Sequence, residues 1–163
     1  VNFTWGRDDS YEHDDSFIHL PMGSPYCEHV RKQIFSFAKS TNISILPAGT
    51  VVVIQGPRFS TAAESRWFSA NGWDIINMTQ YPECYFAKEL GICYATVASI
   101  TDYDAGLQES LTIDPLHADK FLKVFRENTR KTKDLLLAFI DSPFSEFSCK
   151  CAATVVRAYY QQT

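Results

Sequence analysis

Residues 92–106 read I-C-Y-A-T-V-A-S-I-T-D-Y-D-A-G, and this stretch decides how the chain is interpreted. A run of nine mostly apolar or small residues leads to Asp102 and Asp104. Such a run predicts a buried strand over 93–100. Alternate residues of a strand share a face, so both carboxylates can point the same way at its end. Because a buried carboxylate is costly unless it is bound, the two acids either cap the next helix or face a ligand.

Strands and helices alternate along the rest of the chain. The β-branched run 50–55 and the stretch 73–77 predict two further strands. Capping residues, proline and helical spacing predict four helices, over 24–40, from Ser60 or Thr61 to about 71, over 82–90 and over 115–140. This alternation predicts an α/β fold in a single domain, with a mixed central β-sheet flanked by helices.

Charge and hydropathy limit the kinds of partner and location that the sequence predicts. The net charge of −4 comes without a basic block, which argues against nucleic acid. No run of about twenty apolar residues is present, so the sequence predicts no membrane span. The first residues, V-N-F-T-W-G-R-D-D-S, lack the charged-then-apolar pattern of a signal segment. We therefore expect a cytoplasmic protein.

The chain has five cysteines: Cys27, Cys84, Cys93, Cys149 and Cys151. An odd count without framework spacing favours reduced thiols. Cys149-Lys150-Cys151 allows two other interpretations, a strained redox disulfide or half of a metal site. No second cysteine or histidine pair stands at metal-binding spacing, so the sequence favours free thiols and predicts no metal site.

Polar and aromatic residues follow each of the three predicted strands, where ligands bind in α/β sheets. In the turn 56–60, Arg58, Phe59 and Ser60 combine a cation, an aromatic face and a helix start; the alternative is a plain turn with a packed ring. In 77–79, an apolar Met and a hydroxyl lie beside a helix start, although Met78 could fill a gap and Thr79 could cap the helix. A desolvated Asp102 or Asp104 could act as a general acid, since burial raises the pKa of a carboxyl group.

Three motifs in order resemble the trimeric purine nucleoside phosphorylase family, and within it the 5′-methylthioadenosine phosphorylase branch. They are G-P-R-F-S-T-A-A-E-S (56–65), I-I-N-M-T-Q-Y-P-E (75–83) and A-K-E-L-G-I-C-Y-A-T-V-A-S-I-T-D-Y-D (87–104). The resemblance implies phosphate-dependent cleavage of a purine nucleoside to free base and a ribose 1-phosphate. It also implies that Asp102 protonates the leaving base. Asp102, Asp104 and Ser60 together favour a 6-aminopurine over a 6-oxopurine.

The resemblance also implies roles for further residues. Phe59 would pack on the base, Met78 along the ribose, and Thr79 against phosphate or a ribose hydroxyl, with Asn77 in the same substrate-binding motif. His19 would reach across a trimer interface into a neighbour's 5′ pocket. The helix face that lines the 5′ substituent would carry Ala118, Phe121 and Leu122. No cofactor is implied beyond inorganic phosphate as co-substrate.

One departure from the family qualifies these expectations. The family's glycine-rich phosphate loop, and the Arg and His that hold phosphate, precede the part that these 163 residues resemble. The sequence therefore predicts the C-terminal portion of a nucleoside phosphorylase domain, working with a complementary N-terminal chain. The alternative is a non-catalytic truncated paralogue that binds purines or serves as an assembly subunit.

Overall fold

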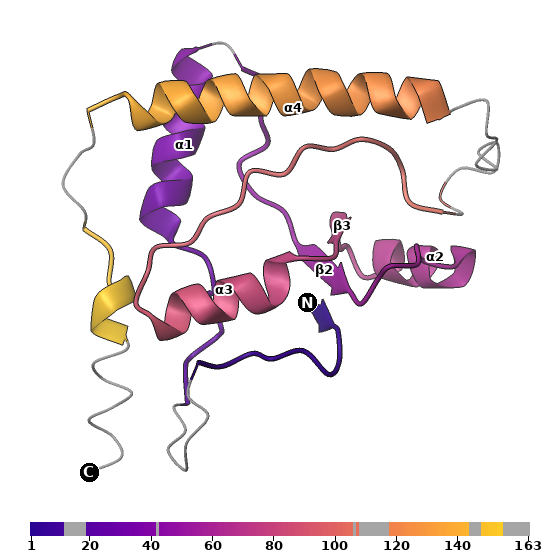
Figure 1. Ribbon diagram of the computed structural model, residues 1–163, viewed down its shortest axis with the longest axis horizontal. Helices are drawn as coiled ribbons and strands as arrows, with labels where there is room; N and C mark the ends of the chain where they lie inside the picture. The colour runs from indigo at the N-terminus through magenta and orange to yellow at the C-terminus, as the bar shows by residue number, and fades with distance from the viewer. Residues whose placement is uncertain (12–18, 42, 106, 108–117, 144–147, 155–163) are drawn as a thin grey trace. The chain divides into compact units, whose positions relative to one another are not determined.

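The computed structural model describes the chain in two compact units, and each is described here by itself. The residues described are 1–11, 19–41, 43–105, 107, 118–143 and 148–154 (Figure 1). Within them, the first unit comprises Val1, 48–78 and 97–143. The second comprises the described parts of 2–47, 79–96 and 148–154.

The first unit is built on two parallel strands, β2 (Val51–Ile54) and β3 (Ile75–Asn77). Their register pairs Val51 with Ile75 and Val53 with Asn77, so both strands end at the same edge. Val52, which lies between Val51 and Val53 on β2, is fully buried, as the continuous apolar run predicts. The backbone of Val1 adds two hydrogen bonds to β2, one to the Val51 carbonyl at 2.6 Å and one from the Val53 N–H at 2.9 Å.

Helix α2 (Ala62–Ala70) follows β2 and begins where the sequence predicts. The Thr61 side chain accepts a hydrogen bond from the Glu64 N–H, and the Glu64 carboxylate accepts one from the Thr61 N–H, which is a complete capping box. The helix ends at Asn71, and Gly72 takes a positive φ of 69°. The same unit contains the long amphipathic helix α4 (Ala118–Ile140), which buries Leu135 and Phe139.

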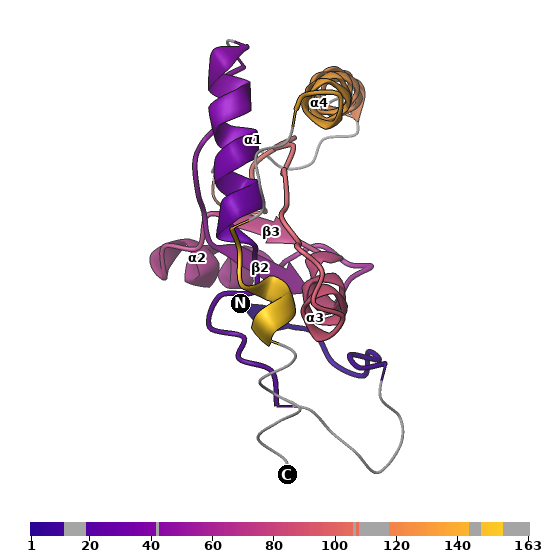
Figure 2. The same ribbon diagram turned by 90° about the vertical axis from the view of Figure 1, so that its left-hand side faces the viewer.

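The second unit contains a short strand, β1 (Asn2–Phe3), and two helices, α1 (Glu28–Ser40) and α3 (Gln80–Glu89). α1 buries Ile34 and Ala38, and Figure 2 shows this helix after a 90° turn of the view. The helix begins four residues after the predicted start at residue 24. Its N-cap, Cys27, has an extended backbone, which is incompatible with a helix through this residue, and it donates its N–H to the Tyr94 carbonyl at 2.7 Å.

The strand predicted over 93–100 is wrong. This segment forms no strand, and Ala98, Ser99 and Ile100 are exposed. Strand residues need a hydrogen-bonded neighbour, and among the described residues none pairs with this segment. Its polar groups bond elsewhere: the Asn128 side chain of α4 donates to the Ile100 carbonyl at 2.7 Å, and the Ser99 and Thr132 hydroxyls lie 2.7 Å apart.

Among the residues that the structure describes, no helix combines the length and the apolar character needed to cross a membrane.

Candidate functional site

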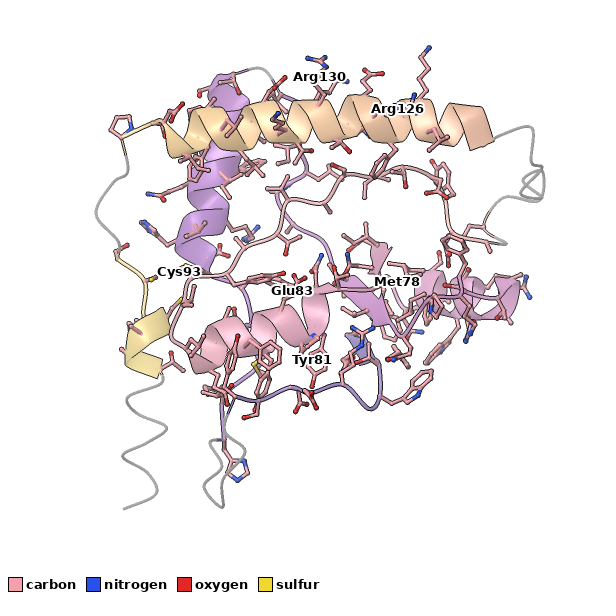
Figure 3. All side chains as sticks on the ribbon, in the orientation of Figure 1. Met78, Tyr81, Glu83, Cys93, Arg126 and Arg130 are labelled. Carbon is pink, nitrogen blue, oxygen red and sulfur yellow. The ribbon has the colours of Figure 1, made fainter. Side chains whose placement is uncertain are left out.

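Two of the predicted motifs meet at the carboxyl edge of β2 and β3. Gly56, just after β2, has a positive φ of 64°, and a Cβ atom placed on it would lie 2.8 Å from the Met78 Sδ. A side chain at position 56 would force the Met78 side chain to shift, and the positive φ itself favours glycine. Met78, which directly follows β3, is half-buried and lies against the turn (Figure 3). The parallel pairing and the missing side chain of Gly56 therefore place the turn 56–60 beside the motif of β3.

The turn itself is fastened to the first turn of α2. The Arg58 guanidinium donates two hydrogen bonds to the Glu64 carboxylate, at 2.9 and 2.8 Å, and one to the Phe59 carbonyl at 2.9 Å. The Arg58 bonds, followed by the bonds from Thr61, lower the pKa of Glu64 to about 2. The Arg58 guanidinium is thus paired with the Glu64 carboxylate of the capping box, and this pair holds the turn 56–60 in its shape.

Phe59 and Ser60 differ sharply in exposure. The Phe59 side chain is 70% exposed, which leaves an aromatic surface open to a flat ligand. Ser60 is only 7% exposed, and its buried hydroxyl oxygen has no hydrogen-bond partner among the described residues. A buried hydroxyl without a partner carries a desolvation cost that a bound polar ligand would relieve.

The two acids have different surroundings. Asp104 is half-buried, and its Oδ2 accepts a hydrogen bond from the hydroxyl of Ser65, which is 1% exposed on α2. Asp102 is exposed, and its Oδ1 accepts a hydrogen bond from the Thr101 hydroxyl at 2.5 Å. The two acids do not follow a strand, since residues 93–100 form none, and of the two only Asp104 is partly buried.

Ser65 is a residue whose role the sequence analysis missed. It lies on the buried side of α2, one turn after the Phe59–Ser60 segment, and its bond to Asp104 links that helix to the acid-bearing segment. The sequence signal that could have identified Ser65 is a small polar residue at a helical position that faces the core. Three predicted strand-end motifs are therefore connected within the first unit, through Gly56 with Met78 and through Ser65 with Asp104.

For the other predicted site residues, the structure gives the exposure of some side chains and does not describe others. Asn77 is half-buried at the end of β3. Thr79 belongs to the second unit, where it is exposed at the N-cap of α3 and its side chain makes no capping hydrogen bond, contrary to the simple helix-cap interpretation. His19 is exposed in the same unit. Leu122 on α4 is 41% exposed, whereas the side chains of Ala118 and Phe121 lie outside the described residues.

Comparison with known proteins identifies the class. The chain belongs to the phosphorylase superfamily, whose sequence profile matches residues 1–141. It is 41% identical over 150 residues to the S-methyl-5′-thioadenosine phosphorylase of Mycolicibacterium smegmatis, covering 91% of this chain and 54% of that protein. It is 36% identical over 160 residues to the protein of the same name from Nitrosopumilus maritimus, covering 98% of this chain and 59% of the relative.

A solved structure agrees with this assignment. The methylthioadenosine phosphorylase from Schistosoma mansoni in complex with adenine superposes with a TM-score of 0.81 at 30% sequence identity. The superposition covers 97% of this chain and 63% of that structure. The chain therefore spans between about half and two thirds of the length of these relatives. The fold class is confirmed as α/β with the architecture of a nucleoside phosphorylase.

Proposed function

We propose that this chain supplies the purine- and ribose-binding part of a nucleoside phosphorylase that cleaves 5′-methylthioadenosine or adenosine with inorganic phosphate. The observation that carries the proposal is the hydrogen bond from Ser65 to Asp104. It ties the acid-bearing segment to the helix that starts directly after Phe59 and Ser60. The names of the relatives support the same substrates.

The arrangement suits a 6-aminopurine. Phe59 offers an open ring face for the base, and the Ser60 hydroxyl lacks a partner among the described residues. Asp104 uses Oδ2 for Ser65, so its other oxygen can accept a hydrogen bond from an exocyclic amine. A 6-oxo group brings a second acceptor to that carboxylate and leaves both unpaired. Such a mismatch costs about 1–3 kcal/mol for each buried group.

Asp102 is the proposed proton donor. In the reaction a phosphate oxygen forms a bond to the anomeric carbon while the glycosidic C–N bond breaks, and its electron pair goes to the base. Negative charge on the five-membered ring is quenched by a proton from the Asp102 carboxyl to the seven-position nitrogen. Asp102 is exposed, so its carboxyl group is accessible to a bound purine. Phosphate is the only co-substrate in this scheme, and no cofactor takes part.

The substrate experiment follows directly. Release of the free base is measured chromatographically, with and without inorganic phosphate, as adenine from methylthioadenosine and adenosine and as hypoxanthine from inosine. Adenine binding is measured by calorimetry. We expect phosphate-dependent release from both adenine nucleosides, with inosine slower by at least about tenfold. Equal turnover of inosine contradicts the 6-amino assignment. Adenine binding without release under any condition favours the alternative of a purine-binding or assembly subunit.

The proposal includes the assembly. His19 is placed in a neighbouring subunit's 5′ pocket within a homotrimer, and the residues that hold phosphate are supplied by a segment preceding this part of the fold, in the same protein or in a complementary chain. The exposure of His19 supports this role. Sedimentation of the active species tests it, because a fully active monomer is incompatible with a site completed by a neighbour.

A further inference from the structure

Four of the five cysteines come together in the second unit. The Sγ atoms of Cys27, Cys93, Cys149 and Cys151 all lie within 4.8 Å of one another, and none of the four forms a disulfide. The Cys93 and Cys149 sulfurs are 3.2 Å apart, well beyond the ~2.05 Å of a covalent bond. Figure 3 shows the Cys93 sulfur directed toward the C-terminal segment. Nothing in the phosphorylase chemistry proposed above uses this cluster.

We propose that these four cysteines form a structural zinc site. Four thiolates around one zinc ion, each at about 2.3 Å from it, lie about 3.8 Å from one another at the corners of a tetrahedron. The Cys93 and Cys149 sulfurs, 3.2 Å apart, would have to separate slightly, and no pair is more than 4.8 Å apart, so shifts of about 1 Å or less reach that geometry. A tetrahedral set of four sulfurs selects zinc among the common divalent metals. Four protein ligands leave no open position, so the ion holds the fold together and does not take part in catalysis.

The cysteines are positioned by contacts other than those between their sulfurs. The Cys27 N–H donates to the Tyr94 carbonyl at 2.7 Å, and the Tyr26 and Tyr94 rings stack with centroids 5.9 Å apart. These contacts align Cys27 with Cys93 independently of any metal. The site is therefore prepared on one side by the backbone of two segments that are far apart in sequence.

The C-terminal segment is fastened to the same place. The Ser148 hydroxyl lies 3.2 Å from the His29 Nδ1 on the first turn of α1, and the Thr154 N–H donates to the Lys150 carbonyl at 3.0 Å. Two views place residues 148–150 beside the start of α1 (Figures 1 and 2). The cysteines on either side of Lys150 are thus presented next to Cys27, and a bound ion would join the C-terminal segment to α1 and to the stretch after α3.

A single ion also accounts for the whole cluster better than a disulfide does. Cys27 is 2% exposed and stands at the N-terminal end of α1. The Cys151 N–H donates a hydrogen bond to the Cys149 sulfur. A disulfide would use only two of the four sulfurs and leave the other pair in the same small volume. One zinc ion uses all four, replacing their thiol protons, which are released to solvent.

The test uses the full chain purified in reductant, and Cys84 provides the control. Cys84 is also buried in the second unit, on α3, but lies outside the cluster. We expect one tightly held zinc per chain by elemental analysis, and a tetrahedral thiolate spectrum after exchange with cobalt(II). Cys149→Ser and Cys93→Ser should lose both signals, whereas Cys84→Ser should keep them. A zinc chelator should lower the melting temperature of the wild type and of Cys84→Ser, but not of Cys149→Ser.

Two measurements on the wild type keep the test decisive if a serine variant fails to fold. Native mass spectrometry counts bound zinc, and thiol titration in denaturant without reductant counts free cysteines. One zinc ion with five free thiols supports the proposal. Five free thiols with no zinc bound after addition of zinc salt overturn it. A disulfide among the four cysteines in protein kept under reductant overturns it as well.

Discussion

The two units assemble their chemical groups in opposite ways. In the first unit the candidate purine site is made of short contiguous motifs, each following a strand or leading into a helix, and fixed by close contacts such as Arg58 with Glu64. In the second unit the four sulfurs come from three segments that are far apart in sequence. The first kind of site can be recognised in a sequence as motifs, whereas the second becomes visible only when the chain is folded.

The two sites also differ in whether their groups stay open to a ligand that exchanges with solvent. The purine site has an open aromatic ring at Phe59 and a buried hydroxyl at Ser60 without a partner in the described residues. These are features of a site whose ligand comes and goes. In the cysteine cluster, one ion would satisfy all four sulfurs and close the coordination sphere. The difference predicts that changes in the groups that contact the purine affect turnover and leave the zinc content unchanged, whereas changes in the four cysteines lower stability.

The largest effect on turnover is expected from Asp102→Asn. The amide cannot supply the proton that the leaving base requires, and loss of a general acid typically lowers the rate by about 10²–10⁴-fold. We expect kcat for the adenine nucleosides to fall by this factor with a smaller change in KM, measured by steady-state kinetics, and zinc content to stay unchanged. Asp134→Asn is the matched control, because Asp134 is an exposed carboxylate on α4 paired with Arg130. Equal rates for the two variants would show that Asp102 is structural.

A second contrast uses two glycines of the first unit. Gly56 and Gly72 both have positive φ angles, 64° and 69°, so an alanine at either costs about 1–2 kcal/mol of folding free energy. Only at Gly56 would the new methyl group also meet the Met78 sulfur, at 2.8 Å, while nothing lies within 4 Å at Gly72. Denaturant unfolding should therefore show a loss of stability in both variants, and the loss in Gly56→Ala should be at least as large as that in Gly72→Ala. KM for the nucleoside should rise several-fold in Gly56→Ala alone, and an unchanged KM there would remove Met78 from the ribose site.

Local rules predicted the parts of the fold that local interactions determine. The capping box at Thr61 and Glu64, the buried run of β2 and the stop of α2 before Gly72 are all found. The strand over 93–100 was wrong because strand formation depends on a partner, and a sequence pattern does not show whether one is present. The start of α1 was misplaced because Cys27 has an extended backbone, in a position where its N–H bonds to the distant Tyr94 carbonyl.

The features of the candidate site also divide into those that local motifs predict and those that depend on distant parts of the chain. Phe59, Ser60, Met78 and the two acids were found as members of motifs, but the link from Ser65 to Asp104 spans 39 positions and could not be predicted from spacing. The sequence prediction of no metal site rested on the absence of a second cysteine pair. The structure supplies that pair from Cys27 and Cys93, each of which is isolated in sequence. Whether a metal binds there remains the prediction argued above.

The smallest expected effect concerns the loop that carries Phe59. Hydrogen bonds from Arg58, then from Thr61, lower the pKa of Glu64 from its ordinary value of 4.5 to about 2. A carboxyl group whose pKa is lower in the folded state stabilises that state above pH 4.5, and this contribution is lost as the pH falls toward 2. Glu64→Gln keeps a capping side chain but removes the charge. We expect its denaturant midpoint to be below that of the wild type at neutral pH, with the gap closing as the pH falls through this range.

A matched carboxylate separates the loop from the general effect of a surface charge. Glu127 on α4 also has a lowered pKa, caused first by its hydrogen bond to Lys131 at 2.7 Å, but it caps no helix. Glu127→Gln should therefore shift the midpoint less than Glu64→Gln, because a single exposed ion pair contributes little. Both variants should bind zinc as the wild type does. If the gap between Glu64→Gln and the wild type stays constant from neutral pH to pH near 2, the Arg58 pair does not hold the Phe59 loop through charge, and the capping hydrogen bonds alone account for its shape.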